Sequence, residues 1–514
     1  MSELNYKFSA ADVLKITGGR LLHGSLSVPF KNISTDSRTI KPEELFIALK
    51  GERFDGHNFI PQVYEKGANG VIVKRSSLED KGWEGEWTVI EVDDTLRALG
   101  DIAHFWRMKH PIPIVGITGS NGKTTTKEMI GSILEITFNI LKTEGNFNNL
   151  IGLPMTLLRL SKKDEIAVLE MGTNARGEIK RLSEISVPDV AVITNIGQAH
   201  LQGLLSVEDV REEKGELFKI LREDSFAIIN QDDPMVLKLA AECKCRKIGF
   251  SMSGDADLMA KDVSVSDSGK VSFRLAAENK DAIIDLPLYG VFTVYNALAA
   301  AGVAQSLGVG LEIIKEGLER FKPLPGRMEI MELDGYTIIN DTYNANPNSM
   351  GQALKTLTGF KRTGRTIAVL GDMLELGEFT ESAHIQIGRM VSGLGIDYLF
   401  TLGKNSVNIA LAASEGGMNE KNIYMENEHQ DVTAKLRAII TKGDCILVKG
   451  SRGMKMELII KELTNQTLDI RLQTGGEKVA KDCTKIKGIG LRLAVNGWQK
   501  CFKLYITAGL SLLL

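Results

Sequence analysis

Short apolar runs alternate with stretches of helical periodicity along most of the chain. These runs lie at 114–118, 166–170, 190–195 and 226–230, and again at 337–341, 366–371, 398–402 and 445–449. The intervening stretches have the apolar spacing and length of helices. Because alternating strands and helices build mainly parallel sheets that helices cover on both faces, the pattern predicts an α/β fold.

Two segments with closely spaced prolines divide this pattern. The first lies at 108–113, and the second is KPLPGR at 322–327. They predict a small α/β N-terminal domain at 1–110 (with strands at 45–49 and 71–73), a central domain at 111–322 with a mainly parallel sheet, and a Rossmann-like C-terminal domain at 323–464. A length of 514 residues agrees with three domains of about 150 residues each. Residues 465–514 are basic, end in GLSLLL, and stand apart as an atypical tail.

Charge and hydropathy exclude several classes of function. Lys and Arg number 62 and Asp and Glu number 65, a net charge of −3 that offers no electrostatic basis for a nucleic-acid or membrane-surface partner. No apolar run approaches the roughly 18 residues of a membrane span. The first residues, MSELNYKFSA, lack the apolar core of a signal peptide. We expect a cytoplasmic protein and a monomer.

The cysteines show no pattern of a disulfide framework or a zinc site. There are five of them, and Cys243 and Cys245 stand one residue apart, unlike the redox spacing C-x-x-C. We therefore expect free thiols in a reducing compartment.

The segment at 116–126, GITGSNGKTTT, carries the strongest chemical signal. It follows an apolar strand and precedes a predicted helix at 127–137, which is the architecture of a phosphate-binding loop. Glycines at 119 and 122 let backbone N–H groups turn toward phosphate oxygens, Lys123 can reach the β- and γ-phosphates, and the Thr124 hydroxyl can ligate Mg²⁺. Ile117 stands where the common pattern has its first glycine, and the alternative is a glycine-rich turn that binds nothing.

Polar residues near the ends of later elements are weaker candidates. Glu170 closes a strand beside the loop and is placed to hold Mg²⁺, or is simply solvated. His200 can ligate a cation, although a lone histidine more often packs or forms hydrogen bonds. Lys214 follows two glutamates, so composition favours a solvated helical face, and only a carbamylated lysine could contact the metal.

Three further residues suggest nucleotide contacts. Asn296 could read an adenine edge or lie on a helix surface, and Asp341 ends a strand as a second candidate. Arg327 follows Pro-Gly at the second domain junction, where a guanidinium could swing onto a triphosphate. Each of these alternatives stays open on the residues alone.

The motifs together, in their order, resemble the Mur ligases, which are ATP-dependent amide-forming enzymes of peptidoglycan precursor synthesis. The resemblance covers about residues 10–460, and that family shares the departure at Ile117. The matching segments are the loop at 118–125, LEMG around Glu170, AHL around His200, EKGELF around Lys214, YNA around Asn296, PGR ending at Arg327 and DTYNANP from Asp341.

The resemblance implies a role for each residue. The expected ATP-phosphate contacts are Gly119, Ser120, Asn121, Gly122, Lys123, Thr124 and Thr125, and the expected adenine, phosphate and ribose-side contacts are Asn296, Arg327 and Asp341. The expected Mg²⁺ ligands are Thr124, Glu170, His200 and a carbamylated Lys214, and Lys123, His200 and Lys214 form the catalytic set. The expected substrate contacts are Ser37 and Arg38 for the uridine nucleotide, Asn148 and Asn149 for the peptide, and Asp372, Glu375 and Arg452 for the incoming dipeptide.

Four segments narrow the resemblance within the family. They are STDSR at 34–38, GNFNNLIGLPMTLL at 145–158, DTYNANPNSM at 341–350 and GDMLELGE at 371–378. They resemble the members that join D-alanyl-D-alanine to UDP-N-acetylmuramoyl-tripeptide through an acyl phosphate. QGLLS follows His200 where those members usually have EGFGS. The alternatives are a sister ligase that adds a diamino acid to the UDP-dipeptide, whose DNPR-type motif this sequence lacks, and a nucleotide-binding protein without ligase activity.

Overall fold

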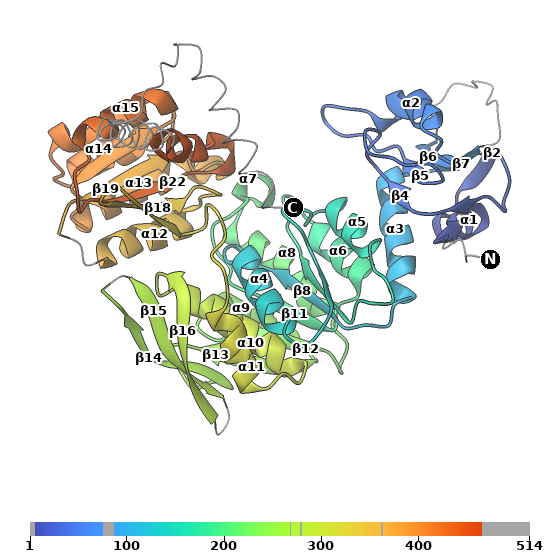
Figure 1. Cartoon of the computed structure of the whole chain (residues 1–514), viewed down its shortest axis with the longest axis horizontal. Helices are drawn as coiled ribbons and strands as arrows, with labels where there is room; N and C mark the ends of the chain where they lie inside the picture. The colour runs from blue at the N-terminus through green and yellow to red at the C-terminus, as the bar shows by residue number, and fades with distance from the viewer. Residues whose placement is uncertain (1–5, 76–86, 268, 278–279, 361–362, 465–514) are drawn as a thin grey trace, which may run out of the picture. The chain divides into compact units, whose positions relative to one another are not determined.

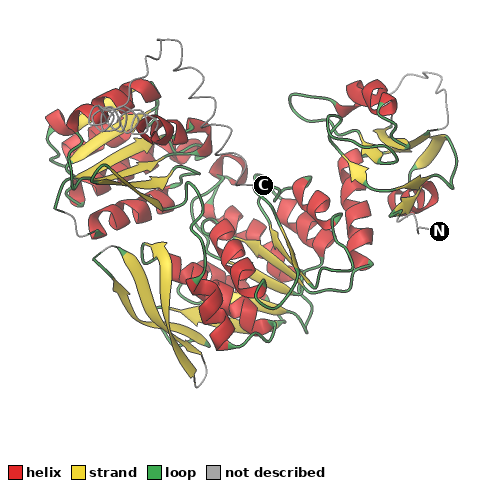
Figure 2. Cartoon of the chain, viewed as in Figure 1, coloured by secondary structure: helices red, strands yellow, loops and turns green. Residues whose placement is uncertain are grey.

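The structure is a computed structural model that describes residues 6–75, 87–267, 269–277, 280–360 and 363–464 (Figure 1). Helices pack on β-sheets throughout these residues, which confirms the expected α/β fold (Figure 2). The predicted tail, with Cys483 and Cys501, lies outside the described residues. None of the described helices combines the length and the hydrophobicity that a membrane crossing requires.

The first 108 residues carry two small sheets. One is the antiparallel pair β1 (Phe8–Ser9) and β3 (Pro29–Phe30). The other has the order β2 (Arg20–His23), β7 (Thr88–Val92), β6 (Gly70–Lys74), β5 (Leu45–Ile47) and β4 (Ile33–Ser34), all parallel except β2. The helices are α1 (Ala10–Thr17), α2 (Ile60–Glu65), preceded by the short 3₁₀ helix η1 (Gly56–Phe59), and α3 (Thr95–Met108).

The middle of the chain forms one nine-stranded sheet. Its order is β16 (Lys280–Tyr289), β15 (Lys270–Ala277), β14 (Leu258–Val265), β13 (Arg246–Ser251), β12 (Phe226–Asn230), β11 (Val190–Ile193), β8 (Ile114–Thr118), β10 (Ile166–Glu170) and β9 (Ile140–Lys142). Neighbours are parallel from β9 to β14, and β14, β15 and β16 are antiparallel. The helices are α4 (Lys123–Leu134), α5 (Gly152–Leu157), α6 (Glu178–Ser186), α7 (Leu201–Leu204), α8 (Val207–Lys219), α9 (Pro234–Glu242), α10 (Thr293–Ser306) and α11 (Leu311–Glu319).

Alternate residues of the central strands enter different hydrophobic cores. On β11, Ala191 and Ile193 join a core built with residues of α3, α5, α6, α8 and α9. Val190 and Val192 of the same strand join a second core with residues of α4, α10 and α11. Because side chains alternate across a strand, both faces of the sheet are buried, which is why its strands are continuous apolar runs.

The third region forms a six-stranded sheet. Its order is β17 (Glu329–Leu333), β18 (Tyr336–Asp341), β22 (Cys445–Lys449), β19 (Thr366–Gly371), β20 (Tyr398–Leu402) and β21 (Ile423–Glu426), parallel except for β17. The helices are α12 (Pro347–Gly359), α13 (Thr380–Gly393), α14 (Val407–Glu415) and α15 (His429–Ile439), with the 3₁₀ helices η2 (Gly377–Phe379), η3 (Glu420–Asn422) and η4 (Arg452–Met454).

Some expected bounds need correction, and one group of strands was not predicted. The helix predicted from residue 127 is α4, which starts four residues earlier at Lys123. The strand predicted to run to residue 195 ends at Ile193, so that Thr194 and Asn195 are free to form a loop. The antiparallel strands β14–β16 were not predicted, because their exposed and buried residues mix without a continuous apolar run.

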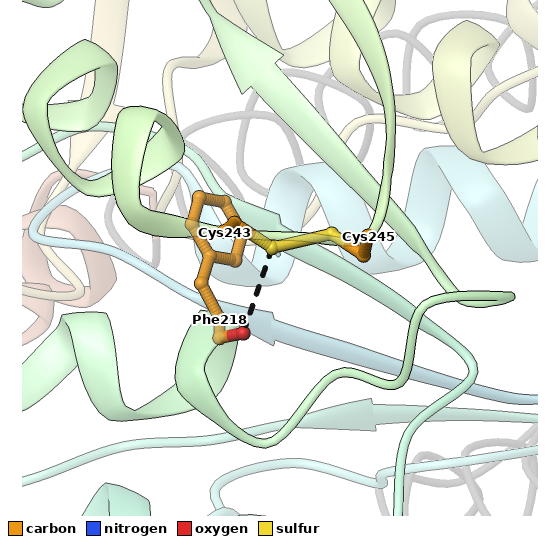
Figure 3. The surroundings of a disulfide bond; sticks show 3 residues. All are labelled: Phe218, Cys243 and Cys245. Atoms are coloured by element: carbon orange, nitrogen blue, oxygen red, sulfur yellow. Dashed lines mark hydrogen bonds between the residues drawn. A yellow bond between two sulfur atoms is a disulfide. The ribbon is translucent and has the colours of Figure 1, made fainter.

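The expectation that Cys243 and Cys245 are free thiols is wrong. The structure joins them in a disulfide at the turn between α9 and β13 (Figure 3). That turn brings their Cα atoms to 5.6 Å, a separation that a disulfide can span. The Sγ of Cys243 lies 3.7 Å from the carbonyl oxygen of Phe218 at the end of α8. Cys445 is buried and forms no disulfide with another described cysteine.

Candidate functional site

A cavity of about 820 Å³ gathers most of the residues that the sequence singles out. Its lining includes the predicted residues Ser120, Asn121, Gly122, Lys123, Thr124, Thr125, Asn148, Asn149, Glu170, His200, Asn296, Arg327 and Asp341. Gly119, Lys214, Ser37 and Arg38 are not among the lining residues. The cavity therefore joins the carboxyl ends of central strands to segments beyond residue 326, as ligand sites of parallel α/β sheets do.

The loop after β8 requires glycine at two positions. Gly119 has φ +149°, and a Cβ there would lie 1.9 Å from Oγ1 of Thr194. Gly122 has φ +82°, and a Cβ there would lie 2.2 Å from Oδ1 of Asn296. Any side chain at either position would push the loop out of its present path.

Asn121 is the fixed point of this loop. Its N–H donates to Oδ1 of Asn195 over 3.0 Å, and its carbonyl oxygen accepts from Nδ2 of Asn195 and from Oγ1 of Thr194. Its side-chain oxygen accepts from Nδ2 of Asn346 over 2.8 Å. Asn346 also caps α12, so one asparagine links the third region to the loop.

The start of α4 is arranged to receive an anion. Gly122 is its N-cap and supplies no side-chain cap, so the N–H groups of the first turn are left for another acceptor. Lys123 donates from Nζ to the carbonyl oxygen of Gly119 over 2.7 Å. Burial lowers the pKa of the Lys123 amine; the nearby charge of Glu170 raises it and that of Arg327 lowers it.

Glu170 offers one carboxylate oxygen to the cavity. The side chain is 2% exposed, and Oε1 accepts from Nδ2 of Asn148 over 2.9 Å. Oε2 is buried, accepts no hydrogen bond from any described residue, and lies 3.9 Å from Nζ of Lys127. Because a buried carboxylate oxygen without a partner is costly, this atom fits a cation ligand better than the solvated alternative.

His200 is oriented by a carboxylate. Its Nδ1 lies 2.9 Å from Oε2 of Glu375, and its backbone has φ +57°. The hydrogen bond from His200 lowers the pKa of Glu375, so this carboxylate accepts, and Nδ1 carries the shared proton. With Nδ1 protonated, the Nε2 of a neutral imidazole has the free lone pair that a metal requires.

Lys214 lies inside the protein, and the expectation from composition of a solvated charged face is wrong. Lys214 is 0% exposed, and no described residue forms a hydrogen bond with its Nζ. Burial lowers the pKa of its amine well below the usual value of 10.5, and the charge of Lys123 lowers it further, while Glu213 raises it. Glu213 itself is occupied, since it accepts the N–H groups of Gly177 and Ile179 at the start of α6, both over 2.7 Å.

The three candidate nucleotide contacts line the cavity, and each has a different hydrogen-bond partner. Asn296 is buried on α10, and its Oδ1 accepts from Oγ1 of Thr126 over 3.3 Å. Arg327 donates from Nη2 to Oγ1 of Thr124 over 2.9 Å. Asp341 accepts from Nζ of Lys449 over 2.5 Å and from the N–H of Met328 over 3.1 Å.

The candidate substrate residues fall into two groups. Asn148 and Asn149 line the cavity, and Oδ1 of Asn149 accepts the N–H groups of Ile151 and Gly152 at the start of α5. Arg38 pairs with Asp36, from Nη2 to Oδ2 over 2.7 Å, on the exposed surface of the N-terminal region. Ser37 is buried beside it.

The residues predicted for the dipeptide have other partners. Asp372 accepts the N–H of Ser406 over 2.7 Å and that of Asn405 over 3.1 Å, so its carboxylate holds the segment before α14. Glu375 pairs with His200, as described above. Arg452 donates to Oε1 of Glu457 over 3.3 Å.

Sequence reasoning missed several residues that shape the cavity. Thr194, Asn195 and Asn346 hold the loop, and Tyr343 stacks on Arg327, whose guanidinium carbon lies 3.8 Å from the ring centroid. Lys449, 2% exposed, neutralises Asp341. Two signals were available: Thr194 and Asn195 follow a central strand, and Asn346 precedes a proline, as a helix N-cap often does.

The acidic residues of the site supply only part of the ligands that a hard divalent cation requires. Within the described residues, no three His, Cys, Asp or Glu side chains gather as metal ligands would. The predicted set offers the Thr124 hydroxyl, Oε2 of Glu170 and Nε2 of His200, with Glu170 as its only carboxylate. A carbamate on Lys214 would add oxygen ligands, which Mg²⁺ prefers.

Three regions of the chain match domains of one family. Residues 29–107 match "Mur ligase family, catalytic domain", residues 117–304 match "Mur ligase middle domain", and residues 326–452 match "Mur ligase, glutamate ligase domain". A relative from Bacillus subtilis (strain 168), named UDP-N-acetylmuramoyl-tripeptide--D-alanyl-D-alanine ligase, is 41% identical over 437 residues, which are 85% of this chain and 93% of the relative.

Two solved structures are similar along most of their length. The crystal structure of MurF from Acinetobacter baumannii is 33% identical, with a TM-score of 0.82 over 90% of this chain and 100% of that one. MurF ligase from Thermotoga maritima in complex with ADP is 28% identical, with a TM-score of 0.76 over 85% of this chain and 98% of that one.

The loop geometry generates a first prediction. The substitution Gly119→Ala would place a methyl group against Oγ1 of Thr194, and we expect it to weaken binding of a non-hydrolysable ATP analogue by at least about tenfold, a loss of about 1.4 kcal/mol. Isothermal titration calorimetry measures this. Gly393→Ala is the control, because a Cβ there meets nothing within 4 Å. Equal affinity of Gly119→Ala and wild type would show that the loop does not hold the phosphates.

Proposed function

This chain belongs to the Mur ligase family, and on that premise we propose that it joins D-alanyl-D-alanine to UDP-N-acetylmuramoyl-tripeptide with consumption of ATP. The relatives and solved structures named above support this substrate pair. The observation that carries the proposal is the single cavity in which the phosphate loop, Glu170, His200 and Arg327 meet. We further propose that the protein is a cytoplasmic monomer with the three domains bounded near residues 110 and 322.

The proposed reaction has two steps. A carboxylate is a poor acyl donor, because its leaving group would be oxide. An oxygen of the tripeptide's terminal carboxylate therefore attacks the γ-phosphorus of ATP, ADP departs, and an acyl phosphate forms. The amine of D-alanyl-D-alanine then attacks the acyl carbon, loses a proton, and expels inorganic phosphate.

Two cationic side chains support the first step. Lys123 and Arg327 would neutralise charge on the transferred phosphoryl group, and they would reduce the repulsion between the carboxylate and the triphosphate. Tyr343 keeps the Arg327 guanidinium in place by stacking on it. Arg327 donates to the hydroxyl of Thr124, at the start of the helix that the phosphate loop precedes.

A divalent cation would polarise the phosphoryl oxygens when bound. Thr124, Glu170 and His200 would hold it. Glu375 would fix the imidazole ring of His200 through Nδ1. Asn148 would fix the Glu170 carboxylate through Oε1, which leaves Oε2 for the cation.

Lys214 would complete this site as a carbamate. A lysine amine adds CO₂ only in its neutral form, and the lowered pKa of Lys214 increases the neutral fraction near pH 7. Since the folded pKa lies below the usual value, the free amine loses its proton at lower pH than a solvated lysine does. The product is an anion, which would satisfy the buried position that now has no partner.

The amine donor decides between the proposed function and its alternatives. We expect ADP formation by the wild type to require both UDP-N-acetylmuramoyl-tripeptide and D-alanyl-D-alanine. Replacing the dipeptide by lysine or diaminopimelate, with the UDP-dipeptide as acyl donor, should leave only background. Coupled measurement of ADP and mass spectrometry of the product report the result. Lys123→Ala should lower the rate by about 10²–10³-fold, the loss typical of one transition-state contact.

Turnover with a diamino acid and not with the dipeptide would identify the sister ligase instead. ATP binding without amine-dependent turnover would indicate a nucleotide-binding protein that is not a ligase. Either result would contradict the proposal.

The carbamate generates a separate prediction. Lys214→Ala should lose most ligase activity, and added short-chain carboxylates should restore part of it, because they can supply the missing anion in the space left by the side chain. Lys219→Ala, an exposed lysine on the same helix, is the matched control and should retain the wild-type rate. The initial rate of ADP formation with and without carboxylate is the measurement. Wild-type activity of Lys214→Ala without carboxylate would refute the carbamate.

A further inference from the structure

Lys127 is a buried cation that the proposed mechanism does not use. It lies on α4, one turn after the phosphate loop, and is 1% exposed. Its Nζ donates to the carbonyl oxygen of Thr143 over 2.6 Å and lies 2.9 Å from Oε1 of Glu128. Oε2 of Glu170 is 3.9 Å away, beyond hydrogen-bond distance. Lys127 thus has two close partners, the backbone carbonyl of Thr143 and the carboxylate of Glu128.

Thr143 connects Lys127 to Glu170, a residue that lines the cavity. Its hydroxyl accepts the N–H of Glu170 over 3.1 Å, and its own N–H donates to the carbonyl oxygen of Val168 over 3.0 Å. The chain then enters the segment at 144–151, which we call the donor loop. Three asparagines of this loop, at positions 146, 148 and 149, line the cavity.

The donor loop returns to the same strand at its other end. Asn148 donates from Nδ2 to Oε1 of Glu170 over 2.9 Å, and its carbonyl oxygen accepts the N–H of Gly172 over 2.8 Å. The loop is thus fixed to the end of β10 at Asn148 and to α4 through Thr143 and Lys127. Removing the ammonium group would release the connection to α4 and leave the connection to β10.

Glu128 has a second cationic partner besides Lys127. Lys142 also pairs with that carboxylate, from Nζ to Oε2 over 2.9 Å, while it pairs with Oε1 of Glu135 over 2.9 Å. A buried ammonium loses its hydration, and an apolar side chain of similar length often packs at least as stably. Packing alone therefore does not account for Lys127, whose bonds to Thr143 and Glu128 are contacts that an apolar residue could not make.

We propose that Lys127 is a positioning residue that ties the phosphate-binding helix to the donor loop, and so sets Asn148 and Asn149 for the acyl donor. The proposal rests on the proposed function, because it takes the occupant of that part of the cavity to be the UDP-linked peptide. Lys127 is not among the residues that line the cavity. It acts on the peptide through the loop, and the phosphate loop keeps its own anchors at Asn195 and Asn346.

The test compares two ligands in two lysine variants. Lys127→Met keeps the length of the side chain and removes the donor, and we expect it to weaken binding of UDP-N-acetylmuramoyl-tripeptide about tenfold, the size of a hydrogen bond from a charged group. Its affinity for a non-hydrolysable ATP analogue should stay within about twofold of wild type, because the anchors of the phosphate loop are intact. Lys142→Met removes the other lysine from Glu128 and leaves the hydrogen bond between Lys127 and Thr143 in place. It should change neither affinity beyond about twofold.

Calorimetric titration gives both affinities, and the KM values for the two substrates should divide in the same way. Unchanged binding of the UDP-tripeptide by Lys127→Met would overturn the proposal. So would an equal loss for both ligands, which is the result expected of general structural damage. If Lys127→Met does not fold, Lys127→Gln takes its place under the same criteria.

Hydrogen exchange without ligands tests the tie itself. Amides of the donor loop should exchange faster in Lys127→Met than in wild type and in Lys142→Met, while the amides of β8 should not change. Equal exchange of the loop in all three proteins would refute the role of Lys127, whatever the substrate is. Failure of the proposed function would be seen separately, as absence of dipeptide-dependent ADP formation by the wild type.

Discussion

Charge held away from water beside the central sheet is the constraint on which the site depends. Glu170, Lys127 and Lys214 are each at most 2% exposed, so each must be matched by a neighbour or remain costly. Lys127 is matched by Thr143 and Glu128. Within the described residues, Oε2 of Glu170 and Nζ of Lys214 form no hydrogen bond, and they are the two places where a cation and a carbamate would add one. The protein thus keeps two polar atoms without a hydrogen bond where the proposed chemistry has use for them.

How much of the fold the sequence predicts depends on burial. Strands β8, β10 and β12 have their predicted bounds, because both faces of the sheet are covered and the strands are continuous apolar runs ended by polar residues. The β14–β16 region alternates buried and exposed residues and contains several charges, so it lacks that signal. The start of α4 was misplaced because the residues after Gly122 are polar and their burial arises from tertiary packing.

The candidate site divides in a similar way. The phosphate loop is a local motif, and its chemistry follows from eleven consecutive residues, so it could be identified from the sequence. The hydrogen bond between Asn346 and Asn121 spans 225 positions, and that between Glu375 and His200 spans 175. The spacing of residues along the sequence does not predict such pairs. Only family resemblance suggested a role for Lys214, whose burial depends on the packing of α8 against α6 and α9.

The neighbouring residues Glu213 and Lys214 show two different uses of burial on one helix. The Glu213 carboxylate accepts hydrogen bonds from the N-terminus of α6, whereas Lys214 has no hydrogen-bond partner in the part of the chain that the structure describes. Mutations at these adjacent positions should therefore be suppressed in different ways. A mutation of Glu213 should be rescued by stabilising second-site mutations or by growth at lower temperature, since both increase the folded population. Under the proposed carbamate, a mutation of Lys214 should resist both, because the folded protein would accumulate and still lack that group.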